Sequence, residues 1–220
     1  METDNGVIPI IWTEGLIGSG KTTFCEEVSR RLEFDFLPEP VSANPYLESF
    51  YKDPKRWAWP MQMHLMAHRF GMKKIADYTA AIKMAKGIML DRCIAGDRVF
   101  AKLHWIAENF SNLEWDTYEY VYQIMARDLQ PPTVLIYLDV QPETAMERVV
   151  KRNRGCETGL ELSYLQALHK GYEELIKELD KGLAPWAHSV TVVRIVWDRD
   201  TVLDSEWDNV AKTVLNSCKR

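Results

Sequence analysis

The sequence lacks the features that mark secreted, membrane-embedded and disulfide-stabilised proteins. It has four cysteines and no C-x-x-C pair, so neither a disulfide framework nor a paired-cysteine metal site is expected. No run approaches the roughly 18 apolar residues that a membrane helix needs. The N-terminal residues are acidic and show no signal-peptide pattern. These absences predict a reduced, cytoplasmic protein without a membrane partner.

A basic excess is also missing. The sequence has 27 lysines and arginines against 32 aspartates and glutamates, which gives a net charge of −5. Proteins that bind the phosphate backbone of DNA or RNA usually carry a positive excess. We therefore expect no nucleic acid polymer as a partner, whereas a small nucleotide needs only a few local cations.

The sequence does have enough apolar residues for a buried core, since hydrophobic residues make up 46% of its 220 positions. Residues 1–220 are expected to form a single α/β domain. Short apolar runs predict strands at 7–13, 35–37, 87–90, 133–140 and 190–197. Longer amphipathic segments predict helices at 21–32, 54–86, 96–109, 115–129, 143–152, 160–179 and 205–215. This alternation favours a parallel sheet covered by helices.

A glycine-rich turn between the first predicted strand and the first predicted helix fits the pattern G-x-x-x-x-G-K-[ST], as GLIGSGKT at 15–22. Glycines let successive backbone N–H groups point at phosphate oxygens. Lys21 then reaches the β- and γ-phosphates, and Thr22 offers a hydroxyl to Mg²⁺. The motif predicts a bound nucleoside triphosphate without naming the reaction. The triphosphate-binding residues expected from it are Gly15, Leu16, Ile17, Gly18, Ser19, Gly20, Lys21, Thr22 and Thr23.

Acidic and basic residues stand at the ends of two further predicted strands. Glu39 follows the second strand, and Asp91 with Arg92 follows the third. In a parallel sheet, the carboxyl ends of the strands open on the binding crevice. One carboxylate there can take a proton from an attacking hydroxyl, and another can hold Mg²⁺ together with Thr22. Taken singly, each residue is an ordinary surface residue, but their joint placement favours a catalytic site.

A cationic cluster lies in the segment ERVVKRNRGCE and contains Arg148, Lys151, Arg152 and Arg154. Two interpretations stay open. The cluster is either a basic helix end that complements the helix dipole, or a lid over the triphosphate. As a lid, from about 148 to 158, its arginines would spread the transition-state charge and exclude water.

With these residues identified, the sequence resembles the deoxyribonucleoside kinase family over nearly its whole length. The matching pieces are GLIGSGKT at 15–22, EPV at 39–41, NPYLESFYKDPKRWAWPMQ at 44–62, the DR pair at 91–92, Asp97 and ERVVKRNRGCE at 147–157. The NP-x-L-x-x-FY stretch is most similar to the bacterial-type branch, which includes deoxyadenosine and deoxyguanosine kinases. The resemblance implies a P-loop NTPase-type three-layer sandwich, with a five-stranded parallel sheet flanked by helices and an arginine-rich lid.

The resemblance also implies a role for each matching residue. Glu39 matches the general base for the 5′-hydroxyl, Arg92 the arginine beside it, and Asp91 the acidic Mg²⁺ ligand that acts with Thr22. The catalytic set implied is Lys21, Glu39, Arg92, Arg152 and Arg154. Arg148 and Arg152 join the ATP-binding residues, Arg148 near the ATP base. The substrate-binding set implied is Glu39, Tyr51, Gln62, Leu65, Arg69, Arg92, Asp97 and Glu157.

Within that substrate set, Tyr51 and Glu157 match the pair that holds the 3′-hydroxyl. Gln62 matches the amide that reads the base edge, and Leu65 lies near the base pocket. Arg69 and Asp97 match a buried ion pair. Such a pair gives a fixed donor–acceptor edge and narrows the pocket where a thymine methyl would sit, unless it is an ordinary structural ion pair.

The expected function is therefore transfer of the γ-phosphoryl group of ATP, with Mg²⁺, to the 5′-hydroxyl of deoxyadenosine, deoxyguanosine or deoxycytidine in preference to thymidine. Two alternatives remain. A nucleoside monophosphate kinase, such as a thymidylate kinase, would need cations for the acceptor phosphate, which Glu39 and Glu157 would repel. A non-catalytic subunit with a kinase fold would have no need of Lys21 or Glu39. The resemblance implies a homodimer, for which the helices at 57–84 and 115–129 offer apolar faces that are equally suited to a core.

Overall fold

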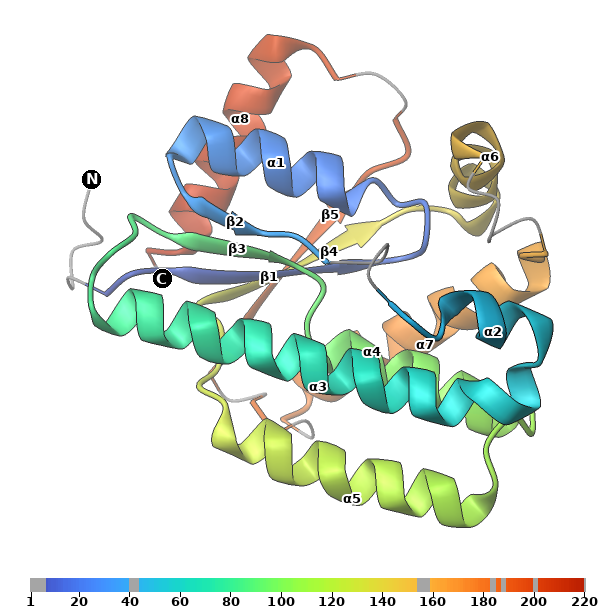
Figure 1. The fold of residues 1–220 in the computed structure, drawn as a ribbon. Helices are drawn as coiled ribbons and strands as arrows, with labels where there is room; N and C mark the ends of the chain where they lie inside the picture. The colour runs from blue at the N-terminus through green and yellow to red at the C-terminus, as the bar shows by residue number, and fades with distance from the viewer. Residues whose placement is uncertain are drawn as a thin grey trace.

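A parallel sheet forms the centre of the computed structural model, which describes residues 7–39, 44–153, 159–182, 185–186, 189–199 and 202–219 (Figure 1). The five strands are ordered β2-β3-β1-β4-β5, and every pairing is parallel. Their bounds are β1 (Ile10–Gly15), β2 (Asp35–Leu37), β3 (Ile88–Asp91), β4 (Val134–Asp139) and β5 (Thr191–Val196). The predicted five-stranded parallel sheet is confirmed.

Helices cover both faces of the sheet, which makes three layers (Figure 1). One face carries α1 (Lys21–Leu32) and α8 (Asp204–Ser217), which contact each other. The opposite face carries α3 (Pro54–Ala81), α4 (Ile94–Ile106) and α7 (Leu162–Asp180), with α5 (Asn112–Asp128) packed outside α3 and α4. Two shorter helices, α2 (Leu47–Lys52) and α6 (Pro142–Arg152), lie beyond the carboxyl ends of the strands.

The central strand β1 begins and ends later than the sequence predicted. It starts at Ile10, directly after Pro9, because proline has no N–H to donate to a neighbouring strand. It continues to Gly15, which pairs with Leu138 of β4. Every residue of β1 is buried, which includes Thr13 and Glu14. Glu14 is therefore a strand residue inside the sheet and not part of a solvated turn.

The long predicted helix at 54–86 is a shorter helix preceded by one that the sequence did not predict. Helix α3 begins where the Asp53 carboxylate accepts from the backbone N–H of Arg56 at 3.3 Å, a typical N-cap, with Pro54 in the first turn. It ends at Ala81, two residues before Lys83 adopts a φ of 54°. The segment before it, for which no element was predicted, contains α2, whose six residues are too few to show helical periodicity.

Several charged side chains are buried together with the apolar core residues. Six charged side chains near the carboxyl ends of the central strands are at most 7% exposed: Glu14, Lys21, Arg69, Asp91, Arg92 and Asp97. Charged side chains are rarely buried unless they are paired, because removing them from water is costly. Their concentration at one edge of the sheet locates the candidate site. Among the described residues, no helix is long and apolar enough to cross a membrane.

Candidate active site

The turn between β1 and α1 wraps closely against neighbouring elements. Gly18 has a φ of +81°, and a Cβ added there would lie 2.4 Å from the backbone oxygen of Ala145 in α6. A side chain at this position would therefore be both strained and sterically excluded. Gly20, with a φ of 86°, precedes the first residue of α1, so the helix N-terminus faces the turn. The predicted phosphate loop thus has the expected shape and the expected helix behind it.

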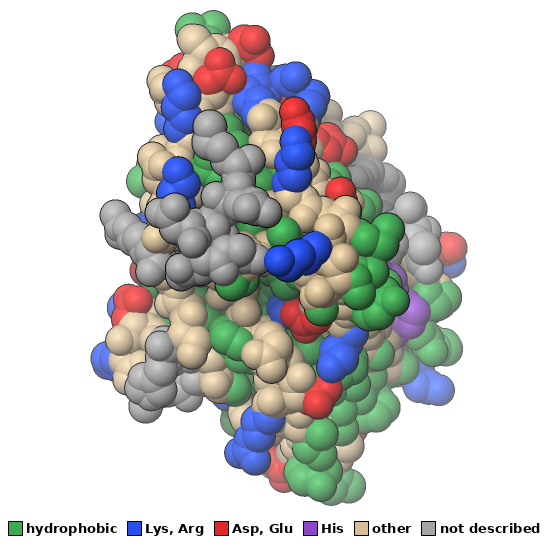
Figure 2. Space-filling view, turned by 90° about the vertical axis from the view of Figure 1, so that its left-hand side faces the viewer, with side chains coloured by type: hydrophobic (Ala, Val, Ile, Leu, Met, Phe, Trp, Pro, Cys, Tyr) green, Lys and Arg blue, Asp and Glu red, His purple; other side chains and the backbone are tan. Residues whose placement is uncertain are grey.

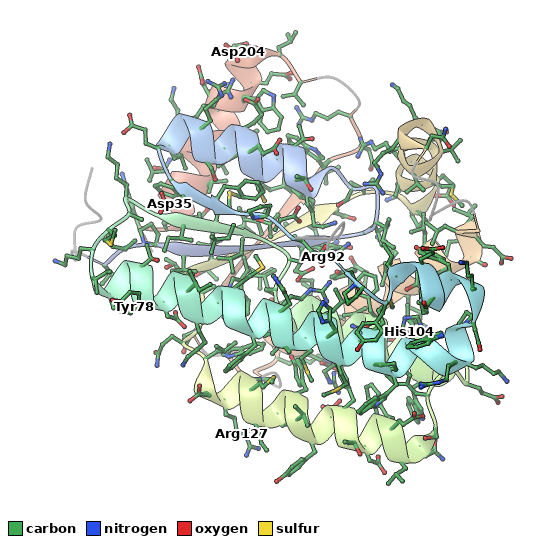
Figure 3. All side chains as sticks on the ribbon, viewed as in Figure 1. Asp35, Tyr78, Arg92, His104, Arg127 and Asp204 are labelled. Carbon is green, nitrogen blue, oxygen red and sulfur yellow. The ribbon has the colours of Figure 1, made fainter. Side chains whose placement is uncertain are left out.

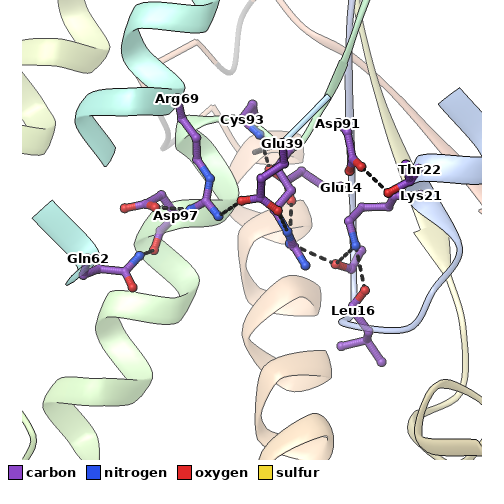
Figure 4. A network of polar contacts seen from close by, with 12 residues as sticks. Glu14, Leu16, Lys21, Thr22, Glu39, Gln62, Arg69, Asp91, Cys93 and Asp97 are labelled. Atoms are coloured by element: carbon purple, nitrogen blue, oxygen red, sulfur yellow. Dashed lines mark hydrogen bonds and ion pairs between the residues drawn. The ribbon is translucent and has the colours of Figure 1, made fainter. Parts of the chain in front are cut away.

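Lys21 lies inside this loop and not in solvent. Its Nζ donates to the backbone oxygens of Gly15 at 3.1 Å and Leu16 at 2.7 Å, and lies 3.4 Å from Oγ of Ser19 (Figure 4). Burial lowers the pKa of Lys21 to about 8, helped by the repulsion of Arg92 and opposed by nearby carboxylates. The ammonium is therefore close to the loop backbone, where the oxygens of a triphosphate would compete for it.

Thr22 and Asp91 come together as the sequence predicted. The Thr22 hydroxyl donates to Oδ2 of Asp91 at 2.6 Å. The other carboxylate oxygen, Oδ1 of Asp91, is buried and has no hydrogen-bond partner among the described residues. An unpaired carboxylate oxygen beside a hydroxyl is a suitable donor set for a hard divalent cation such as Mg²⁺. These two residues therefore fit the predicted metal-binding role.

Glu39 lies between two arginines at the end of β2. It forms ion pairs with Nη2 of Arg69 and with Nε of Arg92, the latter at 3.0 Å (Figure 4). Its side chain is 12% exposed. Burial would raise the pKa of Glu39, but the charges of Arg69 and Arg92 outweigh burial and lower this pKa below 4.5. Glu39 is therefore an ionised carboxylate at neutral pH.

Arg69 also forms the predicted ion pair with Asp97. Its Nη1 contacts Oδ1 of Asp97, and Tyr118 donates its hydroxyl to Oδ2 at 2.6 Å. Gln62 donates its side-chain amide to the backbone oxygen of Asp97 at 3.1 Å. The contact of Arg69 with Glu39 and that of Asp97 with Tyr118 were not predicted, because no sequence motif joins these residues. One guanidinium therefore connects the predicted base-reading residues with Glu39.

Arg92 contacts both Glu39 and the phosphate loop. Its Nη1 donates to the backbone oxygen of Gly15 at 3.2 Å, and its guanidinium lies over the ring of Phe100, 4.9 Å from the ring centre. Nη1 also donates to the hydroxyl of Tyr172 at 2.8 Å and lies 3.5 Å from Oε2 of Glu14. Figure 3 shows Arg92 at the carboxyl ends of the central strands.

Sequence reasoning missed Glu14 and Tyr172. The signal for Glu14 was a carboxylate at the end of an apolar strand, directly before the phosphate loop. No such signal marks Tyr172, because tyrosine is an ordinary residue on the apolar side of a long helix.

A hollow on the other side of the phosphate loop lies between α1, α6 and the segment after β5. Its lining residues include Gly20, Thr23, Arg148, Arg152, Trp197 and Trp207. Arg148 donates to the backbone oxygens of Trp197 at 3.0 Å, Arg199 at 2.8 Å and Ser19 at 3.4 Å. The predicted ATP-binding arginines Arg148 and Arg152 thus lie at this hollow. Arg154 and Glu157, with the rest of the predicted lid from residue 154 to 158, lie outside the described residues.

The remaining predicted substrate residues are on α2 and α3. Tyr51 is half-buried on α2 and packs against Phe50, with ring centres 5.2 Å apart. Burial raises the pKa of the Tyr164 hydroxyl at the start of α7, and nearby Tyr51 raises it further. Leu65 is half-buried on α3, one helical turn from the Arg69 guanidinium that pairs with Glu39. The structure therefore places Tyr51 of α2 near the start of α7, and Leu65 one turn from the side chain that binds Glu39.

Comparisons with known proteins agree with this geometry. The family model described as "Deoxynucleoside kinase" matches residues 11–219. The chain is 34% identical to the deoxyadenosine kinase of Dictyostelium discoideum, over 83% of this chain and 70% of that protein. It is 31% identical to the deoxyguanosine kinase of Bacillus subtilis (strain 168), over 94% of this chain and 96% of that protein.

A solved structure, that of deoxyadenosine kinase from M. mycoides with bound dCTP, superposes with a TM-score of 0.77 at 27% identity. The match covers 94% of this chain and 99% of that one. The two chains therefore share one fold, which is of the P-loop NTPase type. The match of the family model over residues 11–219, together with these relatives, shows that the chain belongs to the deoxynucleoside kinase family and is a phosphotransferase.

Proposed function

We propose that this chain transfers the γ-phosphoryl group of ATP to the 5′-hydroxyl of deoxyadenosine, deoxyguanosine or deoxycytidine, in preference to thymidine. The observation that carries the proposal is the double contact of Arg92. One guanidinium holds Oε2 of Glu39 at 3.0 Å and the backbone oxygen of Gly15 at 3.2 Å. A carboxylate able to accept a proton is thereby tied to the loop that binds the triphosphate.

In this proposal Glu39 takes the proton of the 5′-hydroxyl. Its lowered pKa keeps it ionised at neutral pH, and Arg92 orients it toward the acceptor. Lys21 moves from the loop oxygens to the β- and γ-phosphates, where its charge stabilises the charge of the transferred group. Thr22 and Asp91 would hold Mg²⁺, which when bound neutralises phosphate charge.

The arginines of α6 complete the triphosphate site in our proposal. Arg148 contacts the phosphate loop through the backbone oxygen of Ser19, which supports a place for it beside ATP. Arg152 follows one turn later in the same helix, and Arg154 belongs to the lid that we propose to close over the phosphates. Closure would exclude water and so prevent wasteful hydrolysis of ATP.

The proposed preference for certain nucleobases depends on Arg69, Asp97 and Gln62. The buried pair of Arg69 and Asp97 offers a rigid edge to the exocyclic groups of purines and cytosine. Nε of Arg69 is buried and has no partner in the part of the chain that the structure describes, so a donor is left for the base. A thymine 5-methyl group would clash with this pair. We further propose that Tyr51 and Glu157 hold the 3′-hydroxyl and that Leu65 lines the base pocket.

A transfer assay with labelled ATP and four deoxynucleosides tests the proposal. Glu39→Gln should lower kcat about 10²- to 10⁴-fold while ATP still binds. The double change Arg69→Met and Asp97→Ala should raise the ratio of thymidine to deoxycytidine kcat/KM. Arg56→Met, at an exposed position of the same helix, is the matched control. Full activity of Glu39→Gln would overturn the proposed base, and faster phosphorylation of deoxynucleoside monophosphates would favour the monophosphate kinase alternative.

We also propose that the protein is a cytoplasmic homodimer. The described cysteines Cys25, Cys93 and Cys218 are free and buried, in agreement with a reducing compartment.

The two helices considered for the dimer interface, α3 and α5, each have a buried side and an exposed apolar side. Exposed apolar residues include Ile75 and Tyr78 of α3, Ile82 directly after it, and Leu113, Tyr120 and Ile124 of α5. Figure 2 shows hydrophobic side chains gathered along the right and lower right of its view. Sedimentation analysis at micromolar concentration would distinguish a dimer from a monomer.

A further inference from the structure

Two buried polar side chains, Glu14 and Tyr172, are not among the residues that act on substrate or phosphate in the proposed reaction. Neither side chain is exposed to solvent. A carboxylate inside a sheet is costly unless several donors stabilise it. Glu14 accepts from the backbone N–H of Cys93 at 2.7 Å and from the hydroxyl of Tyr172 at 2.8 Å. Both carboxylate oxygens are therefore used, and each is fixed by a donor from a different element.

The space around the Glu14 carboxylate is shaped to fit it. A Cβ added at Gly96 would lie 2.3 Å from Oε2 of Glu14, so the first turn of α4 presses directly against the carboxylate. The same carboxylate binds the N–H of Cys93, the residue that precedes α4. Glu14 thus links the end of β1 to the start of α4. Arg92 directly precedes Cys93, the residue whose N–H Glu14 binds.

Arg92 itself has an uncommon backbone conformation. Its φ is 70°, a left-handed value that costs a non-glycine residue free energy. Its N–H donates to the backbone oxygen of Thr13 at 3.0 Å, and its neighbour Cys93 is held by Glu14. Contacts on both sides therefore keep the backbone of Arg92 in this conformation, with its side chain directed at the phosphate loop and Glu39.

The Tyr172 hydroxyl connects Glu14 to the side chain of Arg92. It accepts from Nη1 of Arg92 at 2.8 Å and donates to Oε2 of Glu14 at 2.8 Å. The opposite side of the guanidinium, Nε, holds Glu39 at 3.0 Å. A continuous series of contacts thus runs from a buried carboxylate, through one hydroxyl and one guanidinium, to the proposed base.

We propose that Tyr172 and Glu14 are positioning residues for phosphoryl transfer: they fix the Arg92 guanidinium in the orientation in which it holds Glu39 beside the phosphate loop. This inference rests on the proposed function, because it assigns Arg92 its role through Glu39. Without the Tyr172 hydroxyl, no group bridges Nη1 of Arg92 and Oε2 of Glu14, which lie 3.5 Å apart. Arg92 can then rotate, and Glu39 loses a fixed partner without losing its own carboxylate.

Tyr172→Phe tests the proposal, because it removes one oxygen and keeps the ring, which stacks on Tyr137 with ring centres 5.7 Å apart. We expect kcat to fall about 10- to 100-fold, as for a lost hydrogen bond to a charged group, with the KM for ATP within about threefold of the parent. The acid limb of kcat/KM should move to higher pH, because a loosened Arg92 lowers the pKa of Glu39 less.

Tyr137→Phe is the matched control. Its hydroxyl is also buried and has no partner among the described residues, so its removal should change neither kcat nor the acid limb. If Tyr172→Phe and Tyr137→Phe have equal kcat, the proposal is wrong. Should Tyr172→Phe fold poorly, Glu14→Gln decides, since it must also lower kcat and shift the acid limb.

Combination with Glu39→Gln separates this inference from the proposed function. If Tyr172 acts through Glu39, adding Tyr172→Phe to Glu39→Gln should cause little further loss of kcat. Full additivity would overturn the positioning role while leaving Glu39 as the base. A Glu39→Gln enzyme that keeps the kcat of the parent would instead overturn Glu39 as the general base of the proposed function.

Discussion

The guanidinium of Arg69 forms an ion pair with Glu39 while it also binds Asp97. Arg69, which we propose selects the nucleobase, therefore contacts Glu39, which we propose accepts the proton. Arg69, Arg92 and Lys21 are the charges that lower the pKa of Glu39. A substrate that draws Arg69 toward its nucleobase should therefore also change the basicity of Glu39. The proposed recognition of the nucleobase and the proposed proton transfer thus share one side chain.

This coupling predicts a pH effect for Arg69→Met. A general base works when it is deprotonated, so activity is lost as pH falls through the pKa of Glu39. Arg69 lowers this pKa, so its removal should move the acid limb of the kcat/KM profile to higher pH. The pH profile with deoxycytidine measures the shift. Arg56→Met should leave the profile unchanged, and an unmoved limb in Arg69→Met would contradict the coupling.

Asp91→Asn should weaken the binding of Mg²⁺. An asparagine oxygen can still accept from Thr22, but an NH₂ group replaces one of the two carboxylate oxygens and cannot bind a cation. We expect the Mg²⁺ concentration for half-maximal activity to rise about tenfold or more, with chelation abolishing activity in the parent. Asp116→Asn, an exposed change on α5, is the control. Equal Mg²⁺ dependence in both variants would exclude Asp91 as a ligand.

The parts of this site that could be predicted from the sequence are those encoded by adjacent residues. The loop at 15–22 is a contiguous motif, so its shape and the place of Lys21 followed directly. Helix α2 was missed because its six residues are shorter than two helical turns. Tyr172 was missed for a different reason: its partners Glu14 and Arg92 are 158 and 80 residues away, and only packing of α7 on the sheet brings them together.

The lowered pKa of Lys21 predicts pH-dependent binding of ATP. In the free protein this pKa is about 8, so Lys21 loses its proton as pH rises above that value. Bound phosphates favour the charged form, so binding at pH 8 to 9 should take up a proton and weaken as pH increases. Calorimetry in buffers with different ionisation enthalpies measures the uptake. Lys21→Met should show neither the uptake nor measurable catalysis, and uptake that persists in this variant would point to another group.

Burial of His104 predicts that acid destabilises the protein. His104 lies between the rings of Phe50 in α2 and Phe110, with ring centres 5.1 and 5.8 Å away, and is 4% exposed (Figure 3). Burial lowers its pKa from 6.5 to about 4. A folded-state pKa below the unfolded value gives stability that is present above pH 6.5 and is lost as pH falls toward 4.

The loss from this one group should reach about 3 kcal/mol of the free energy of unfolding near pH 4, at 1.36 kcal/mol for each pKa unit. Urea unfolding at pH 7, 6 and 5 should show the decline in the parent and a flatter dependence in His104→Leu. His68→Gln, at an exposed position of α3, should follow the parent. Because Phe50 is next to Tyr51, the KM for the deoxynucleoside should also rise at low pH in the parent, more steeply than in His104→Leu. Parallel declines in all three proteins would show that His104 does not control the effect.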